Sequence, residues 1–394
     1  MIDETLLDSP DGLIRADTRG LLRAIAASGA HVRTAARAAA ESGLARLAPE
    51  GRPGTLLVAG TGPAVPLAAG LLGALAGDGL RVSPLRPTGA LAAPGALTWP
   101  LPRWVGPLDL LLIVTDDGAE AGLSLLLEAA FRRGCAVVTV APERSPLAEV
   151  TVHRRSLTIP HAPAPFQESG GHPAAPGPAW ALLTPLLLLG DRLGLFEAPG
   201  DAVAAMADRL DAVAERCGPT TRTHDNIAKS LAAEFSATVP LLWSEGPLAE
   251  AAARHATGTL TALAGRPALT AGLPEALGEH GALLGGSLIP GADPDDFFRD
   301  RVEEPQPLRA RVVLLRGPLR PDEPGGMGEP DEEENVPGVP TAAGAARDLA
   351  FQQGVAFSEL TAEEGSGPLE TAAEFIARLD FTAVYLTLAA GTGP

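Results

Sequence analysis

Short apolar runs separated by helical patterns occur twice along this sequence, and this repetition constrains the fold more than any other feature. The runs are residues 55–60, 81–85, 108–114 and 135–140 in the first half and residues 239–243, 311–316 and 354–360 in the second. Uninterrupted apolar runs are typical of strands buried on both faces, and helices between them are the usual crossovers of a parallel sheet. We therefore predict an α/β fold with two tandem units, each a parallel sheet flanked by helices.

Helical segments precede the first unit and join it to the second. Residues 12–47 space their apolar side chains as amphipathic helices do, which predicts one or two leading helices. The alanine-rich pattern of residues 201–217 predicts a linking helix. The expected parts are an N-terminal helical segment, a first unit, the linking region and a second unit, with the bounds 1–50, 51–195, 196–223 and 224–394.

Residues 318–340 interrupt the second unit with seven acidic residues among prolines and glycines. A segment of this composition buries too little apolar surface to order itself, so we expect a flexible insertion. The alternative that this composition leaves open is a docking segment for a basic partner.

The charge of the chain argues against two classes of partner. The sequence has 48 acidic and 30 basic residues, which gives a formal net charge of −18. A field of that sign repels nucleic acid backbones and anionic lipid surfaces. No apolar run approaches the roughly 18 residues of a membrane span, and residues 181–190, the longest candidate, contain Pro185. We expect neither nucleic acid nor a membrane as a partner.

The cysteines, histidines and glycines argue against disulfides and common cofactors. Only Cys135 and Cys217 are present, and the N-terminal stretch lacks the features of a signal peptide, so a cytoplasmic location is expected. None of the seven histidines has metal-binding spacing. Gly60 and Gly62 follow the first apolar run, where backbone amides can meet an anion, but Pro63 removes a donor from that turn. We expect no metal and no nucleotide cofactor.

Acid–base chemistry by a histidine with a carboxylate or a lysine is the chemistry that these residues leave open, since no serine lies in a G-x-S-x-G elbow. Lys229 is the only lysine of the chain. It is either a residue of a ligand cleft or a surface or capping lysine paired with a carboxylate. His280 is either a catalytic residue or a histidine of a surface loop.

Residues 224–258 resemble the centre of the bifunctional phosphoglucose/phosphomannose isomerases, which belong to the sugar isomerase (SIS) domain superfamily. That family has an Asn-x-Ala-Lys helix, a strand written roughly as Pro-x-Ile-x-Gly, and a helix that contains Ala-Arg. The matching residues here are Asn226, Ala228, Lys229, Pro240, Gly246 and Arg254. The resemblance extends over residues 55–195 and over the last helix, so it implies two SIS-like units and a homodimer.

Three departures from the family pattern concern activity. The family's phosphate loop, Ser-x-Ser-Gly-x-Thr, reads Thr-Asp-Asp-Gly-Ala-Glu at residues 115–120. Asp117 and Glu120 there accept hydrogen bonds without donating any, and a carboxylate about 4 Å from a phosphate charge is repelled by roughly 1–4 kcal/mol. The family's proton-shuttling glutamate is replaced by Thr261 or Ala262. The lysine that the family carries near its C-terminus has no counterpart.

The resemblance implies a function and a set of site residues. The function is that of a glucose or mannose 6-phosphate aldose–ketose isomerase-like protein with a degenerate phosphate loop and no catalytic glutamate. The alternative is a non-catalytic sugar-binding, regulatory or partner protein built on the same fold. The ligand is a sugar or sugar phosphate, and glucose 6-phosphate isomerisation is predicted to be very slow or absent. The implied catalytic residues are His280 and Lys229, and the implied substrate-binding residues are Gly60, Gly62, Thr115, Asp117, Gly118, Glu120 and Arg254.

Overall fold

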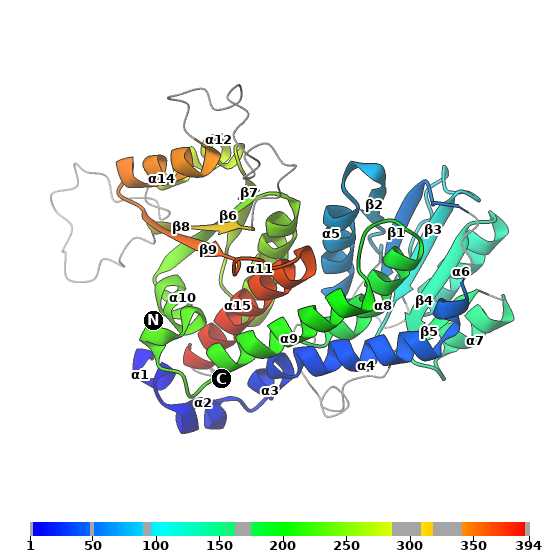
Figure 1. Cartoon of the computed structure of the whole chain (residues 1–394), viewed down its shortest axis with the longest axis horizontal. Coiled ribbons are helices and arrows are strands. Elements are labelled where there is room, and N and C mark those ends of the chain that lie inside the picture. The colour runs from blue at the N-terminus through cyan, green and yellow to red at the C-terminus, as the bar shows by residue number, and fades with distance from the viewer. Residues whose placement is uncertain are drawn as a thin grey trace.

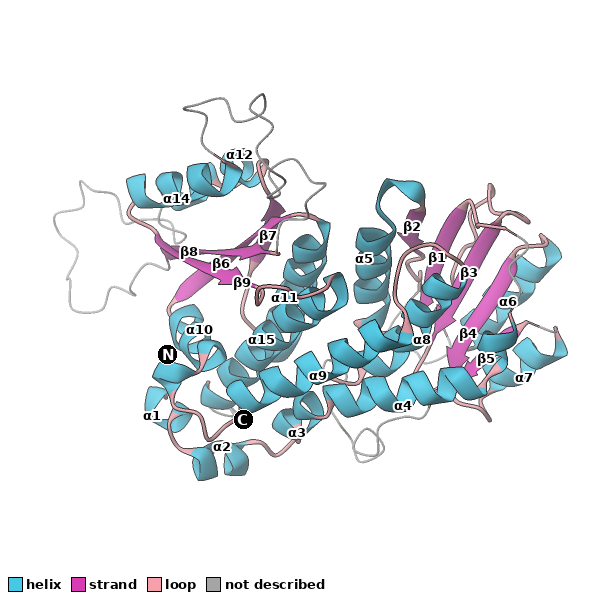
Figure 2. Cartoon of the chain, viewed as in Figure 1, coloured by secondary structure: helices cyan, strands magenta, loops and turns pink. Residues whose placement is uncertain are grey.

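The structure of the chain is a computed structural model in which long helices bridge two α/β units (Figure 1). It describes residues 3–47, 51–89, 96–154, 156–161, 175–285, 309–317 and 341–390. The segment 318–340, for which we expected a flexible insertion, lies outside the described residues. Figure 2 shows one sheet in each unit, with helices on both sides of it. The predicted fold class, two tandem α/β units with leading helices, is confirmed.

The first unit contains a five-stranded parallel sheet in the order β2-β1-β3-β4-β5. Its strands are β1 (Thr55–Gly60), β2 (Arg81–Pro84), β3 (Asp109–Val114), β4 (Ala136–Ala141) and β5 (Leu157–Pro160). The apolar runs predicted the first four. The fifth was not predicted, because a four-residue edge strand with mostly half-buried side chains leaves no apolar run in the sequence.

Helices cover both faces of this sheet. Leu57 and Leu111 point to one face, whereas Leu56 and Leu112 point to the other, because successive side chains of a strand alternate between faces. The helices against the first face are α6 (Ala121–Arg132) and α7 (Pro146–His153), and those against the second are α5 (Ala64–Ala76) and α8 (Ala179–Arg192).

The second unit contains a four-stranded parallel sheet in the order β7-β6-β8-β9. Its strands are β6 (Thr238–Glu245), β7 (Leu269–Gly272), β8 (Arg309–Arg316) and β9 (Ala356–Thr361). One face packs on α10 (Ile227–Ser236), α11 (Pro247–Ala264) and α15 (Pro368–Ala389), and the other on α12 (Ala276–Glu279), α13 (Gly281–Leu284) and α14 (Ala342–Gln352). The sequence did not predict β7, which is as short as β5.

The N-terminal helices and the linking helix bridge the two units. They are α1 (Glu4–Leu7), α2 (Pro10–Ala16), α3 (Leu21–Ala26), α4 (Ser28–Glu41) and α9 (Gly200–Arg216), and three 3₁₀ turns are η1 (Gly43–Arg46), η2 (Gly77–Gly79) and η3 (Thr223–Asp225). Helices α4 and α9 lie side by side (Figure 1). The expectation of one or two leading helices is wrong. Gly20 takes a φ of 66°, and the Asp17 carboxylate accepts hydrogen bonds from the first amides of α3, so a new helix begins there.

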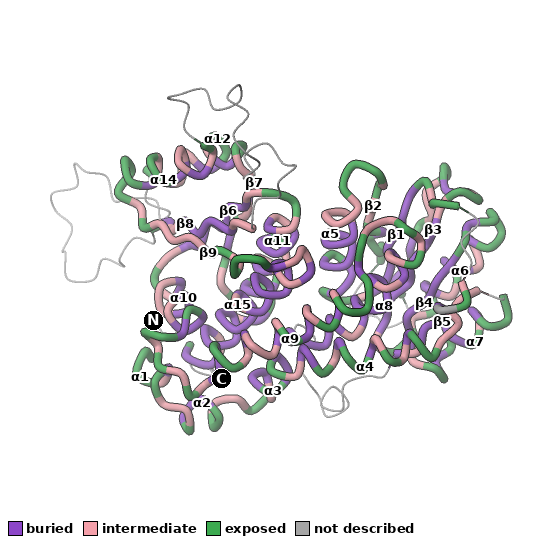
Figure 3. Tube along the Cα trace, viewed as in Figure 1, coloured by how far each residue is buried: buried purple, intermediate pink, exposed green. Residues whose placement is uncertain are grey.

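A single apolar core runs from the inner face of the first sheet, through the bridging helices, to the inner face of the second. Figure 3 shows this as buried segments along the facing sides of α5, α8, α9, α11 and α15. Smaller separate cores fill the outer face of each sheet. The two units therefore pack into one body through their inner faces. Cys135 and Cys217 are buried and unpaired in it.

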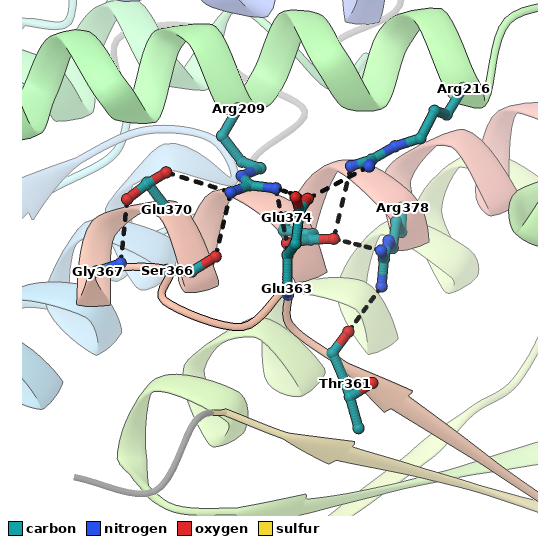
Figure 4. A network of polar contacts seen from close by, with 9 residues as sticks. All are labelled: Arg209, Arg216, Thr361, Glu363, Ser366, Gly367, Glu370, Glu374 and Arg378. Atoms are coloured by element: carbon teal, nitrogen blue, oxygen red, sulfur yellow. Dashed lines mark hydrogen bonds and ion pairs between the residues drawn. The ribbon is translucent and has the colours of Figure 1, made fainter.

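An ionic network ties the linking helix α9 to the last helix α15 (Figure 4). The Glu374 carboxylate is fully buried and is surrounded by Arg209, Arg216 and Arg378. The amide of Glu363, in the loop after β9, donates to the same carboxylate at 3.2 Å. A buried carboxylate needs such compensation, because burial of an isolated charge is costly.

Among the described residues, no helix is both long and apolar enough to cross a membrane.

The strand order reverses between β1 and β3, and we call this switch point, outside the carboxyl ends of the two strands, the crevice. The chain leaves these two strands in opposite directions along the sheet, so the loops at their carboxyl ends diverge, and ligands of open parallel sheets bind at such points. The equivalent point of the second sheet, between β6 and β8, holds the ion pair of Glu245 with Arg316. The crevice between β1 and β3 is therefore the candidate site.

Candidate functional site

The loop after β3 satisfies its own hydrogen bonds. The Thr115 hydroxyl donates to Oδ1 of Asp117 at 3.1 Å, and the amide of Ala119 donates to the same oxygen at 3.0 Å. The amide of Gly118 donates to the Thr115 hydroxyl at 3.1 Å. The structure thus links Thr115, Asp117 and Gly118 by hydrogen bonds, and the Asp117 carboxylate takes up donors that a bound anion would use.

Two further acidic side chains flank this loop. Asp116 pairs with His161 across 3.2 Å, and the His161 ring is almost completely buried directly after β5. Glu120 stands at the start of α6, with a buried Oε1 that has no hydrogen-bond partner among the described residues. The sequence reasoning missed His161, because the strand that carries it to this edge was not predicted. The carboxyl edge of the first sheet is therefore acidic, as Asp117 and Glu120 suggested.

The turn after β1 depends on its two glycines. A Cβ atom on Gly60 would lie 1.9 Å from the carbonyl oxygen of Val114, so only glycine allows β1 to end this close to β3. Gly62 takes a φ of 79°, which side chains disfavour. Both glycines shape the wall of the crevice, and Pro63 then begins the approach to α5.

A buried histidine and a carboxylate meet where the two units pack. Nε2 of His255 in α11 lies 2.9 Å from Oδ1 of Asp380 in α15, and the Thr259 hydroxyl lies 3.3 Å from the same nitrogen. Burial alone lowers the pKa of His255, but the charge of Asp380 and its hydrogen bond outweigh that effect, so the pKa lies above its ordinary value. The sequence reasoning missed this pair, because 125 residues separate its members.

Two cavities adjoin His255. One, of about 90 Å³, is a groove between α5 and α11, and the other, of about 10 Å³, lies against the start of α8. Pro63, directly after the glycine turn, lines both. Arg254 lines the groove from its exposed side and pairs with Glu250. Of the predicted binding residues, Arg254 thus lies next to the junction of the two units.

Lys229 lies in a buried environment of backbone carbonyl groups. Its side chain is fully buried, and Nζ donates to the carbonyl oxygens of Pro219 at 2.8 Å and Thr221 at 2.7 Å. Burial lowers the pKa of this amine. The expectation of a surface lysine paired with a carboxylate is wrong, because the partners are backbone carbonyls. None of the described cavities next to His255 contains it.

Asn226, the first residue of the Asn-x-Ala-Lys motif, has a structural function as well. Its side-chain oxygen accepts from the amides of Ala228 and Lys229 and so caps α10, while its amide group donates to Gly218 at 3.2 Å. The motif therefore closes the loop between α9 and α10 from inside. This is a structural function for the best-matched motif of the sequence.

His280 lies beneath the outer face of the second sheet, not in the crevice of the first. Its ring is buried, and Nδ1 accepts a hydrogen bond of 2.9 Å from the indole of Trp243 in β6. Burial lowers the pKa of His280. The surface-loop alternative is wrong, since the ring is buried. The structure thus separates His280 and Lys229 from each other and from the predicted binding residues.

Comparison with known proteins identifies the second unit. Residues 224–394 match the family of the bacterial phospho-glucose isomerase C-terminal SIS domain. The second unit is a divergent SIS domain of the phosphoglucose isomerase type. This confirms the resemblance that the sequence showed. No curated protein matches the chain.

Solved structures share this SIS fold over nearly the whole chain. A hypothetical protein from Thermus thermophilus is 14% identical, with a TM-score of 0.60, over 98% of this chain and 89% of that one. Tagatose-6-phosphate ketose/aldose isomerase from Escherichia coli is 13% identical, with a TM-score of 0.55, over 98% and 94%. The C-terminal domain of glucosamine-fructose-6-phosphate aminotransferase from Francisella tularensis is 10% identical, with a TM-score of 0.55, over 97% and 98%.

Proposed function

We propose that this SIS protein binds a sugar derivative in the crevice between β1 and β3 and isomerises glucose 6-phosphate very slowly or not at all. The main support for this proposal is the hydrogen bonding of Asp117, whose carboxylate accepts from the Thr115 hydroxyl and the Ala119 amide. Membership of an isomerase-like SIS family supports a sugar or sugar phosphate as the ligand class. A cytoplasmic homodimer, which the family resemblance implies, belongs to the same proposal.

The electrostatics of the crevice disfavour a phosphoryl group. A phosphate at this edge would have to displace Asp117 from its donors and would then lie beside an unpaired carboxylate. Repulsion at about 4 Å costs roughly 1–4 kcal/mol, and each 1.4 kcal/mol weakens binding tenfold. Carboxylates accept hydrogen bonds well from sugar hydroxyls and from amino groups. We therefore expect neutral or amino sugars to bind better than phosphorylated ones.

The second candidate is an active sugar-phosphate isomerase, which the match of residues 224–394 to an isomerase family favours. His280 would be its ring-opening residue. Trp243 occupies Nδ1 of this histidine, which leaves Nε2 as the nitrogen that can exchange a proton. Because His280 lies away from the crevice of its own chain, this candidate requires that a second subunit brings the histidine to the site.

A thermal-shift series tests the proposed function. The probes are glucose, glucosamine and glucose 6-phosphate, and we expect the first two to raise the melting temperature more than the third. The variant Asp117→Ser frees the loop donors and should strengthen binding of glucose 6-phosphate about tenfold or more. Asp78→Ser, which removes an exposed carboxylate in the turn after α5, is the matched control and should change nothing.

A coupled assay on the purified protein separates the two candidates. We expect glucose 6-phosphate turnover below detection. Turnover on the order of 1 s⁻¹ or faster would overturn the proposal, since that is an ordinary enzymatic rate. In that case Glu279, next to His280, is the first carboxylate to replace as a substitute base.

A further inference from the structure

The two ring nitrogens of His255 differ in their contacts with the described residues. Nε2 is held by the Asp380 carboxylate at 2.9 Å and by the Thr259 hydroxyl at 3.3 Å. The described residues provide no hydrogen-bond partner for Nδ1. A histidine whose one nitrogen is fixed by a carboxylate presents the other nitrogen in a defined orientation and protonation state. Such an arrangement transfers protons efficiently when a substrate reaches the free nitrogen.

The space next to this ring has the character of a ligand site. The groove of about 90 Å³ has mainly apolar walls, which come from α5 of the first unit and α11 of the second, and only a few polar groups. Small-molecule sites are typically concave, largely apolar and placed where two structural units meet. His255 and Thr259 line both the groove and the smaller cavity, so the ring borders both spaces.

The charged groups around His255 are few. Helix α5 has no titratable side chain, and those of α8, Asp191 and Arg192, stand at its far end. Helix α15 contributes Asp380, and α11 contributes Arg254 at the rim of the groove. The protonation of His255 is therefore governed mainly by burial and by Asp380.

We propose that His255, oriented by Asp380, is a proton-transfer residue in the groove between α5 and α11 and acts on an open-chain sugar at the carbon next to its carbonyl. The inference rests on the proposed function, since it requires that the sugar bound outside the carboxyl ends of β1 and β3 extends past Pro63, which lines the groove directly after the glycine turn. Neutral Nδ1 takes the proton, the C–H electron pair forms the carbon–carbon double bond of an enediolate, and the carbonyl π pair moves to oxygen. Return of a proton from Nδ1 to carbon restores the carbonyl, so no oxidant or cofactor is consumed.

Solvent-proton exchange tests the inference without requiring net isomerisation. The full chain is incubated in D₂O with fructose or with fructose 6-phosphate, and NMR measures deuterium incorporation next to the carbonyl. Wild type should exchange fructose faster than fructose 6-phosphate, at a rate that rises with pH as His255 becomes neutral. His255→Gln should lower the rate on the order of 10²-fold or more. Asp380→Asn should move the pH midpoint of exchange downward.

A second variant separates proton transfer from a purely structural role of the pair. Ala262→Leu occupies part of the groove and leaves His255 and Asp380 unreplaced, and it should abolish exchange. Thr261→Ala, on the exposed side of the same helix, is its control and should exchange like wild type. His153→Gln, at an exposed histidine, is the control for His255→Gln.

Three results would overturn the inference. It fails if His255→Gln exchanges as fast as wild type, or if Ala262→Leu does. It also fails if fructose raises the melting temperature of wild type but undergoes no exchange, in which case the proposed sugar binding stands. If none of the sugars in the thermal-shift series binds, the proposed function itself is wrong, and this inference falls with it.

Discussion

The ammonium group of Lys229 lies 5.4 Å from the centroid of the Tyr385 ring, and the Tyr385 hydroxyl donates at 2.6 Å to the carbonyl oxygen of Cys217. The two side chains thus both bind the loop between α9 and α10, since Lys229 also donates to the carbonyls of Pro219 and Thr221. A cation over an aromatic face is favourable, and more so when both groups are desolvated. The only lysine of the chain is therefore part of its folded core.

Replacing Lys229 should destabilise the protein. Lys229→Ala leaves a cavity and two carbonyl groups without their donor, and we expect a loss of about 2–5 kcal/mol in the free energy of unfolding. Urea unfolding measures it. Arg222→Ala, in the same loop but exposed, is the control and should remain close to wild type. A fully stable Lys229→Ala variant with weakened sugar binding would show instead that the amine acts on the ligand.

The His255–Asp380 pair should make stability depend on pH in the alkaline direction. The pKa of His255 is raised in the folded state, so its stabilising contribution is complete below the ordinary value of 6.5 and is lost as pH rises through the folded pKa. The free energy of unfolding of wild type should decrease as the pH is raised from 6 to 9. The fall should be smaller in His255→Gln.

His280 should make the stability of the protein depend on pH in the acidic direction. Its pKa is lowered by burial, so its contribution is present above the ordinary value of 6.5 and is lost as pH falls through the folded pKa. Replacement by glutamine should flatten the acid side of the stability profile and leave the alkaline side as in wild type. An unchanged acid side in this variant would show that the ring is accessible enough to charge without cost.

The network around Glu374 should be important for holding α9 against α15. Glu374→Ala leaves the guanidinium groups of Arg209 and Arg378 without their buried partner, and removal of one member of a buried ion pair costs about 3–5 kcal/mol. Thermal unfolding measures the loss. Glu364→Ala, an exposed carboxylate in the neighbouring loop, should have no comparable effect.

The glycines after β1 should tolerate substitution very differently. Gly60→Ala places a Cβ atom 1.9 Å from the backbone of Val114, so it should disrupt the end of the sheet or prevent folding. Gly62→Ala meets no atom within 4 Å but has a φ of 79°, so it should cost about 1 kcal/mol. Gly79→Ala, without either constraint, should be neutral. Melting temperatures of the three variants test this order.

The strands that form the centre of each sheet could be predicted from the sequence. Residues 55–60 and 108–114 are almost entirely apolar because both of their faces are buried, and that pattern is local. The edge strands β5 and β7 were not predicted, although the equally short β2 was, since four partly exposed residues give only a weak pattern. The acidic loop at residues 115–120 was also visible in the sequence.

The candidate site shows the same division between local and long-range information. The sequence by itself determined two parallel sheets, the glycine turn after β1 and the carboxylate in place of loop hydroxyls, because each depends on residues close together in the chain. Only the tertiary structure decided that Lys229 binds backbone carbonyls, that His280 lies under Trp243, and that His255 meets Asp380. These partners come together through packing of helices that are distant in sequence, and no local pattern encodes which buried faces will meet.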